Sequence, residues 1–223
     1  MSESQLTIAV IGGTGNLGQG LAYQFAKVGH RVIIGSRLAE KAEISARKTS
    51  AQSGRKVRGL ENSAAAAEAD LVFLTVPYSN HRIILESIYD EVQGKIFVDT
   101  TVPLNPPAVS CVHLPEEGMV AEQSQKFLGE NVRVVSAFQN VAAAHLQDDQ
   151  HQADCDVLVC GNDPEARKVI ITLAEAIGFR ALEAGTIENS AVAEALTSVL
   201  IFMNRLYKIN GAGIRITGEA GIA

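Results

Sequence analysis

IAVIGGTGNLGQGLA, residues 8–22, is the stretch that decides how this chain folds. Four apolar residues come first, five glycines follow within nine positions, and an apolar run with helical spacing comes last. Glycine is about 1 kcal/mol less favourable than alanine inside regular structure, so a cluster of this kind needs a reason. We infer that something approaches the backbone here that a side chain would exclude.

The glycines match the pattern G-x-G-x-x-G through Gly13, Gly15 and Gly18, between a predicted strand and a predicted helix. In that context the N–H groups at the start of the helix bind the pyrophosphate of a dinucleotide, whose negative charge the helix dipole favours. Gly13 and Gly15 allow the tight turn and the close approach, and Gly18 lets the helix pack against the strand. The loop therefore predicts a dinucleotide-binding site.

The end of the second predicted strand indicates which dinucleotide binds. NAD enzymes place an acidic residue there to hold the ribose 2′-hydroxyl. This chain instead has Ser36 and Arg37, with Lys41 one turn into the next helix. A hydroxyl and two cations suit a 2′-phosphate, and the Arg37 guanidinium is also able to stack on adenine. Thr14, inside the glycine loop, offers a further hydroxyl, and we expect NADP as the coenzyme.

The rest of the chain alternates short β-rich apolar runs with alanine-rich helical stretches, a pattern typical of a parallel sheet covered on both faces. Strands are expected at residues 6–12, 30–36, 56–60, 69–77, 95–101, 131–138, 156–161 and 179–185. Helices are expected at residues 16–28, 39–52, 63–69, 80–92, 120–128, 141–146, 164–177 and 191–207. Asp163 followed by Pro164 is a strong helix start signal.

This pattern predicts a doubly wound, mostly parallel Rossmann-type α/β sheet with a small C-terminal α/β lobe. We expect an NADP-binding domain over residues 1–138 and the lobe over residues 139–223.

Two loops follow the fourth and fifth predicted strands, and ligands in such sheets bind beyond the carboxyl ends of the strands. The first loop, Thr75–His81, contains Val76 and Pro77, and the second is Thr100–Pro103. We expect both loops to pass near the ribose or the nicotinamide. Asp99, which ends the fifth strand, is expected either to form a structural hydrogen bond or to touch the nicotinamide ribose.

The composition excludes several classes of protein. The formal net charge is −6 and no basic stripe occurs, so nucleic acid is not an expected partner. The longest apolar run, near residues 199–203, is too short to cross a membrane. The polar segment of residues 1–6 does not resemble a signal peptide, and three cysteines without pair spacing indicate reduced thiols, so we expect a cytoplasmic protein. Cysteines and histidines show no metal-site spacing, and no catalytic constellation is evident.

The last predicted helix is apolar around most of its circumference. Its apolar residues at helical spacing are Val192, Leu196, Val199, Leu200, Met203 and Leu206, and Ile201 and Phe202 widen this surface. A helix of this kind has to be buried on both sides. Because a second subunit is able to supply part of that cover, we expect a homodimer or a larger assembly.

With these motifs in place, the chain resembles the NADPH-dependent reductases of the deazaflavin coenzyme F420. The likeness runs from the glycine loop nearly to the C-terminus. It is carried by IGGTGNLG, GHRVIIGSR with Lys41, TVPYSNH, VVSAF, DVLVCGND, ALEAG, and EALT followed by NGAG. The nucleotide domains of membrane ferric reductases are similar at a greater distance.

The resemblance implies a set of contacts. The residues implied to contact NADP are Thr14, Gly15, Asn16, Leu17, Ser36, Arg37, Lys41, Val76, Val102 and Ala143. The C-terminal lobe, from Gln139 onward, is implied to hold the deazaflavin against the nicotinamide. The chain departs from the family pattern at Gln139 (where members have histidine), Ala142 (proline) and Ala191 (arginine), so we expect weaker deazaflavin binding than in members that carry the histidine and the arginine.

The function expected from this resemblance is hydride transfer between NADP(H) and coenzyme F420 by an NADP-dependent oxidoreductase. Such a transfer needs alignment of two ring systems and exclusion of water rather than a protein nucleophile. Two alternatives use the same nucleotide site: an NADPH-dependent flavin or ferric-type reductase, and a non-catalytic NADP(H)-binding redox sensor.

Overall fold

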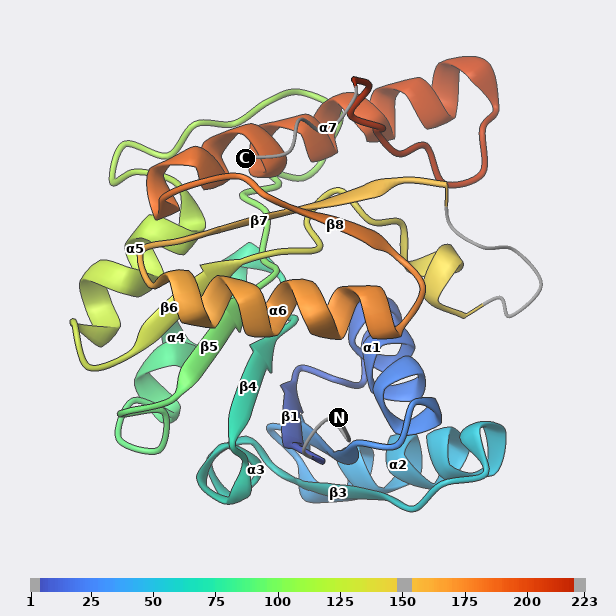
Figure 1. Ribbon diagram of the computed structural model, residues 1–223, viewed down its shortest axis with the longest axis vertical. Helices are drawn as coiled ribbons and strands as arrows, with labels where there is room; N and C mark the ends of the chain where they lie inside the picture. The colour runs from blue at the N-terminus through green and yellow to red at the C-terminus, as the bar shows by residue number, and fades with distance from the viewer. Residues whose placement is uncertain (1–4, 148–153, 219–223) are drawn as a thin grey trace.

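The structure, a computed structural model, describes residues 5–147 and 154–218 (Figure 1). The strands are β1 (Thr7–Ile11), β2 (Arg31–Ser36), β3 (Val57–Glu61), β4 (Leu71–Leu74), β5 (Ile96–Asp99), β6 (Arg133–Ser136), β7 (Asp156–Gly161) and β8 (Arg180–Glu183). The α-helices are α1 (Asn16–Lys27), α2 (Ala39–Ser53), α3 (Asn62–Glu68), α4 (Tyr78–Ser87), α5 (Val120–Leu128), α6 (Pro164–Ala176) and α7 (Ser190–Tyr207). Two 3₁₀ helices are η1 (Ala143–Leu146) and η2 (Ile187–Asn189). Residues 1–4, which belong to the polar segment at the N-terminus, lie outside the described residues.

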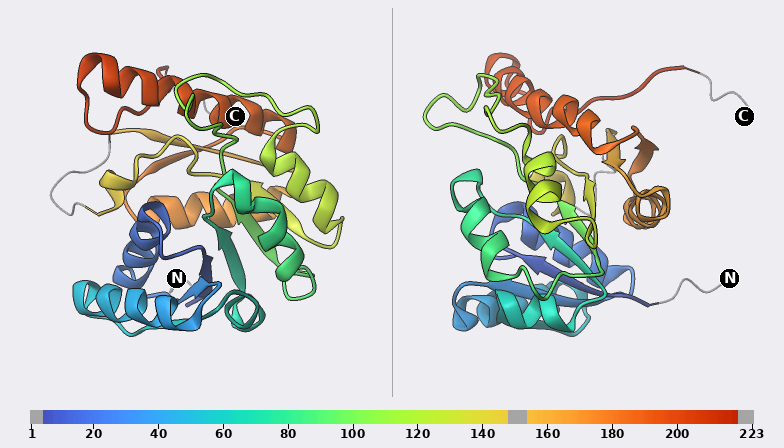
Figure 2. Two further views of the ribbon diagram at one scale, coloured as in Figure 1. Left: turned by 180° about the vertical axis from the view of Figure 1, so that it is seen from behind. Right: turned by 90° about the vertical axis from the view of Figure 1, so that its left-hand side faces the viewer.

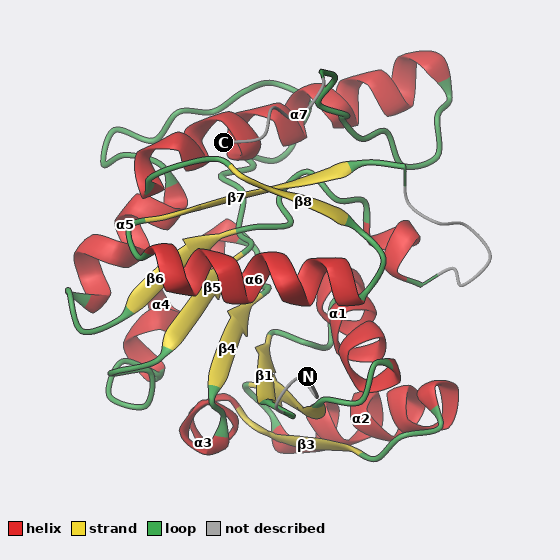
Figure 3. Ribbon diagram, viewed as in Figure 1, coloured by secondary structure: helices red, strands yellow, loops and turns green. Residues whose placement is uncertain are grey.

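The eight strands form one sheet in the order β3-β2-β1-β4-β5-β6-β7-β8, with helices on both faces (Figure 3). Neighbouring strands are parallel except β6 and β7, which run antiparallel. This arrangement confirms the predicted doubly wound, mostly parallel α/β fold. The residues of the predicted C-terminal lobe supply β7 and β8, which extend the sheet. The strand order reverses between β1 and β4, where ligands of such sheets bind.

Alternating side chains of the central strands build two hydrophobic cores. In β1, Ile8 and Val10 face a core shared with α1 and α6, whereas Ala9 and Ile11 face a core shared with α3, α4 and α5. A strand covered on both faces requires apolar residues at both sets of positions. Figure 2 shows the resulting layers, with α6 on one side of the sheet and α4 and α5 on the other.

Helix α4 begins and ends earlier than the expected residues 80–92. Pro77, with a φ of −60°, stands at its N-cap, and the helix ends at Ser87. Ile88 and Val92 continue the apolar spacing in the following turn, and both are fully buried. Their burial in a turn explains why the spacing resembles a helix beyond Ser87. The helix expected at residues 141–146 is the shorter 3₁₀ helix η1.

The start of α6 follows its predicted signal. A carboxylate oxygen of Asp163 accepts a hydrogen bond of 2.6 Å from the backbone N–H of Ala166, and Pro164 occupies the first turn. This cap satisfies one of the backbone donors that a helix start leaves without a partner.

Helix α7 lies beyond β7, beside the long loop that joins β5 to α5 (Figures 1 and 2). Its Ala193 and Leu200 are buried, whereas Val199, Phe202 and Leu206 are exposed. One side of this helix is therefore exposed in the single chain, although its apolar pattern predicts burial on both sides.

Candidate nucleotide-binding site

A cleft of about 550 Å³ opens at the carboxyl ends of β1, β2 and β4. It is lined by Gly12, Thr14, Gly15, Ser36, Arg37, Leu38, Lys41, Asn62, Thr75, Val76, Pro77, Asn80 and Ile84. The glycine loop, the end of β2 and the start of α4 therefore surround one space. This is the crevice where the topology of the sheet places a ligand.

The glycine loop packs against the loop that follows β4 with no room for side chains. Gly12 has a φ of +77°, and a Cβ there would lie 2.6 Å from Val76 Cγ1. A Cβ on Gly18 would lie 2.5 Å from Thr75 Oγ1 and 2.7 Å from Gly13 Cα. The left-handed turn thus falls on Gly12, one residue before the G-x-G-x-x-G pattern begins, and Gly18 allows the close packing predicted for it.

Gly15 differs from these glycines because its open side has little protein near it. A Cβ there would have Gly12 O, at 3.6 Å, as its nearest neighbour. Gly15 is the N-cap of α1, and the first turn of that helix carries no acidic residue. The backbone donors at this helix start and the absence of a carboxylate in its first turn fit a phosphate group.

The opposite end of the cleft is cationic. Ser36 ends β2 and is buried, whereas Arg37 and Lys41 are exposed. Within residues 5–147 and 154–218, neither Arg37 nor Lys41 is paired with a carboxylate. Cations without a protein partner beside a buried hydroxyl fit a second phosphate, the 2′-phosphate of NADP.

The structure gathers some of the predicted site residues in the cleft and leaves others outside it. Those that line the cleft are Thr14, Gly15, Ser36, Arg37, Lys41, Val76 and Pro77. Those that do not are Gly13, Asn16, Leu17, Val102 and Ala143. Gly13 is buried, and its N–H donates to Val10 O and Gly35 O. Asn16 and Leu17 form the first turn of α1, Val102 lies in the loop after β5, and Ala143 begins η1.

Six cleft residues were not among the predicted site residues: Gly12, Leu38, Asn62, Thr75, Asn80 and Ile84. Pro77, Asn80 and Ile84 are spaced by three and four residues, so one face of α4 forms a wall, and this spacing is visible in the sequence. Asn62 directly follows β3, as Gly12 and Thr75 follow β1 and β4. This position after a strand is a weak signal, because a single asparagine there has no recognisable pattern and the pairing of β3 with β2 is what brings it to the cleft.

Asp99 forms structural hydrogen bonds at the end of β5. Its carboxylate is fully buried, 2.8 Å from His81 Nε2 and 2.5 Å from Ser124 Oγ, and it accepts from the Thr101 N–H. Burial acts to raise the pKa of Asp99, but the adjacent His81 and these hydrogen bonds hold that pKa below its usual value. Of the two roles expected for Asp99, the structure supports the structural hydrogen bond.

Glu194 joins α7 to the start of α5. Its carboxylate is fully buried and accepts hydrogen bonds from the N–H groups of Val120 (2.7 Å) and Ala121 (3.1 Å) and from Ser190 Oγ (2.9 Å). Burial raises the pKa of Glu194 to about 7, against the opposing effect of these donors. Helix α7 is therefore attached to the start of α5 through a titratable group.

We expect Glu194→Gln to reduce the dependence of stability on pH. A carboxyl group whose pKa is higher in the folded state binds more protons folded than unfolded, so the free energy of unfolding falls as pH rises from about 4.5 to about 7. The rise of the Glu194 pKa from 4.5 to about 7 changes the free energy of unfolding by about 3 kcal/mol over this pH range. Urea unfolding of both proteins at pH 5, 6, 7 and 8 measures this difference, and parallel profiles would contradict it.

Gln139, one of the departures from the family pattern, is turned into the protein interior. It is buried, and its Nε2 donates to Asp99 O and Ser136 Oγ, each at 2.8 Å. Thr197 of α7 donates from its hydroxyl to Gln139 O. The side chain thus connects the ends of β5 and β6. Ala142 and Ala191, the other departures, are half-buried.

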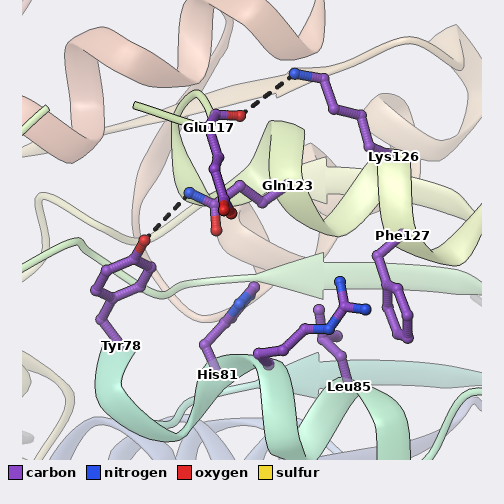
Figure 4. Close-up of a pocket in the computed structure, with 8 residues that line it drawn as sticks. Tyr78, His81, Leu85, Glu117, Gln123, Lys126 and Phe127 are labelled. Carbon is purple, nitrogen blue, oxygen red and sulfur yellow. Dashed lines mark hydrogen bonds between the residues drawn. The ribbon is translucent and has the colours of Figure 1, made fainter. Parts of the chain in front are cut away.

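A second cavity, of about 520 Å³, lies between α4 and α5 (Figure 4). Tyr78 and Gln123 meet across it in a hydrogen bond of 3.2 Å, and the Arg82 guanidinium lies 3.8 Å from the centre of the Phe127 ring. Its most deeply buried polar residue, His81, is held by Asp99 and Ser124. This cavity and the nucleotide cleft are lined by different residues of α4.

Neither a metal site nor a membrane-spanning helix occurs within the described residues. Over residues 5–147 and 154–218, no group of three or more histidine, cysteine, aspartate or glutamate side chains is placed to hold a metal ion. Nor does any helix in these ranges combine the length and apolarity that crossing a bilayer requires. Cys155 and Cys160 are buried, and burial raises the pKa of each thiol to about 11, so neither resembles a reactive cysteine.

Known proteins of similar sequence and structure indicate the family of this chain. The family model described as NADP oxidoreductase coenzyme F420-dependent matches residues 7–103. The F420-dependent NADP reductase of Methanocaldococcus jannaschii is 46% identical over 221 residues, covering 95% of this chain and 98% of the relative. That of Methanothermobacter thermautotrophicus is 44% identical, covering 95% of each chain. The crystal structure of an Arthrobacter sp. FB24 protein proposed to be an F420-dependent NADP reductase superposes with a TM-score of 0.81 at 26% identity, covering 96% of this chain and 100% of that one.

Proposed function

We propose a reaction for this chain, which belongs to the family of F420-dependent NADP reductases: it transfers a hydride between NADP(H) and the deazaflavin coenzyme F420. The observation that carries the proposal is the identity of 41–46% to three such reductases over most of the chain. The cleft supports the nucleotide half of the reaction, because its glycine loop and cationic end fit a dinucleotide with a 2′-phosphate.

The residues of the chain bind and orient the reactants. When both coenzymes are bound, they supply the chemistry, a hydride passing from one ring to the other. Gly15 and the start of α1 hold the pyrophosphate, and Arg37 and Lys41 hold the 2′-phosphate. Val76 and Pro77 line the cleft at the start of α4. Holding the pyrophosphate and the 2′-phosphate fixes the adenosine half and the centre of the coenzyme, which limits the positions open to the nicotinamide and lowers the entropic barrier of the transfer.

The two parts of the chain then have different tasks. Residues 1–138 bind NADP, and residues 139–223 bind the acceptor and contact a second subunit. This division is supported by the cleft, whose lining residues all precede residue 85. It is also supported by the attachment of α7 through Glu194 and Thr197 to α5 and to Gln139. The cysteines, all free, support a cytoplasmic location.

Comparing electron acceptors with the purified full chain and NADPH tests the proposed reaction. Initial rates are measured with coenzyme F420, FMN, FAD and a ferric chelate under anaerobic conditions. The proposed function requires that F420 is reduced fastest, with one F420 reduced for each NADPH oxidised. Fastest turnover with FMN, FAD or the ferric chelate would favour a flavin or ferric-type reductase, and NADPH binding without any turnover would favour a redox sensor.

A homodimer or larger assembly joined through α7 is part of the proposal. Four apolar side chains recur along one face of this helix: Val192, Val199, Phe202 and Leu206, with exposed fractions of 63%, 41%, 52% and 57%. A row of exposed apolar residues of this length is typical of an interface between proteins. A second copy would supply the cover that the apolar pattern predicts.

Phe202→Glu is expected to convert the assembly to monomers without unfolding the chain, because a carboxylate is costly to bury at an apolar contact. Light scattering at micromolar concentration measures the mass, and far-UV circular dichroism checks the fold. Ile44→Glu is the matched control, since Ile44 is an apolar residue of α2 that is 54% exposed and lies apart from α7. A monomeric unmodified chain would contradict the proposal.

A further inference from the structure

An unsatisfied amide lies at the base of the nucleotide cleft. Asn62, the first residue of α3, is 4% exposed and lines the cleft. Its Oδ1 atom is buried and has no hydrogen-bond partner. In folded proteins the large majority of buried polar atoms have a partner, because leaving one unsatisfied is unfavourable. An orphaned acceptor at the edge of a cleft is therefore a sign of a missing ligand.

The position of this amide is fixed by its neighbours. A Cβ on Gly35 of β2 would lie 3.0 Å from Asn62 Oδ1 and 2.7 Å from Ile11 Cδ1. The amide thus packs directly against the backbone of β2, in a place that only glycine at position 35 leaves open. Among the described residues, three other side chains have an unsatisfied buried atom (Thr101, Gln139 and Asn140), and none of them lines this cleft.

The rest of the cleft determines which part of a nucleotide reaches Asn62. The glycine loop fits the pyrophosphate and the end of β2 fits the 2′-phosphate, so the ribose between these phosphates lies near Ser36. The base attached to that ribose has to occupy the remaining space, between Asn62 and the α4 wall with Ile84. Ile84 offers an apolar surface for the face of a base, and the amide offers a polar group for its edge.

We propose that Asn62 binds the edge of the adenine base of NADP, an inference that rests on the proposed function for the identity of the nucleotide. Adenine presents an amino donor at N6 beside ring-nitrogen acceptors at N1 and N7. A carboxamide presents the complementary acceptor and donor side by side, and rotation of the amide exchanges the two. Asn62 therefore selects the base, while Arg37 and Lys41 select the 2′-phosphate.

Asn62→Leu, which keeps the number and the branching of the side-chain heavy atoms, tests the contact in the full chain. Equilibrium titrations use three probes: NADP, adenosine 2′,5′-bisphosphate, and etheno-NADP, in which a two-carbon bridge joins N1 and N6 of the base. We expect the variant to bind NADP and the bisphosphate about tenfold more weakly. The unmodified protein should bind NADP more tightly than etheno-NADP. In the variant, the ratio of the two dissociation constants should be about tenfold smaller.

Two further measurements separate recognition from a structural role. The melting temperature of the free variant should stay unchanged or rise, because leucine removes a buried unsatisfied atom. Asn131→Leu, a control at an exposed asparagine that does not line the cleft, should keep the preference for NADP over etheno-NADP. A lower melting temperature with an unchanged preference would make Asn62 structural and overturn the inference, as would unchanged affinities. If the unmodified protein bound none of the probes, the proposed function would fail as well.

Discussion

Arg37→Ala is expected to raise the dissociation constant of NADPH about tenfold or more and to change that of NADH little. Arg37 directly follows β2 and Lys41 lies in the first turn of α2, and both line the cleft that fits the 2′-phosphate. Neither has a carboxylate partner in the described part of the chain. A hydrogen bond to a charged group contributes about 1.5–3 kcal/mol, and each 1.4 kcal/mol is a factor of about ten in affinity. Discounted for solvent exposure, two such contacts should favour NADPH over NADH by roughly 100-fold.

Ser36→Asp should shift this preference further. Ser36 is buried at the end of β2, so a carboxylate there would repel the 2′-phosphate and accept a hydrogen bond from the ribose 2′-hydroxyl of NADH. Calorimetric titration of the unmodified protein and both variants with NADPH and NADH measures the six relevant affinities. Equal affinity of the unmodified protein for the two coenzymes would refute the assignment of Ser36, Arg37 and Lys41.

The second large effect concerns the glycine loop. Gly18→Ala places a methyl group 2.5 Å from Thr75 Oγ1 and 2.7 Å from Gly13 Cα, so the loop has to move away from β4. Overpacking of this kind costs about 1–3 kcal/mol of stability, or roughly 2–4 °C of melting temperature for each kcal/mol in a chain of this size. We also expect at least about a 100-fold loss of NADPH affinity, because the displaced loop no longer presents its N–H groups.

Gly15→Ala is the informative partner of that variant. Its methyl group has no protein atom nearer than Gly12 O at 3.6 Å, so the free protein should lose little stability. Binding should nevertheless weaken, because the methyl group occupies space that the pyrophosphate needs. Thermal unfolding and NADPH titration of both variants separate the two roles. Unchanged NADPH affinity in Gly15→Ala would show that no phosphate approaches this backbone.

Local patterns predicted the elements that depend on neighbours in sequence. The glycine loop, the bounds of α5 and the Asp163 cap of α6 follow from residues within one or two turns of each other. The end of α4 was missed, because Ile88 and Val92 are buried in a turn and repeat the apolar spacing of a helix.

Contacts between residues that are far apart in the sequence could not be predicted from these local patterns. Glu194 binds backbone groups 73 and 74 residues earlier in the chain, and Asp99 and Ser124 meet across 25 residues. In the cleft, the cationic residues and glycines have recognisable spacing, whereas Asn62 reaches it only because β3 pairs with β2. A single asparagine after a strand has no pattern of its own, so the fold had to place it.

Deuterium transfer tests the central claim, direct hydride transfer between the two coenzymes, most directly. NADPH carrying deuterium at both C4 positions is incubated with F420 and the purified chain in ordinary water, and the reduced deazaflavin is analysed by mass spectrometry. We expect one carbon-bound deuterium in the reduced deazaflavin for each NADPH oxidised, because the ring carbon that accepts the hydride keeps it. Reduced deazaflavin without deuterium, or oxidation of NADPH that leaves F420 unreduced, would contradict the claim.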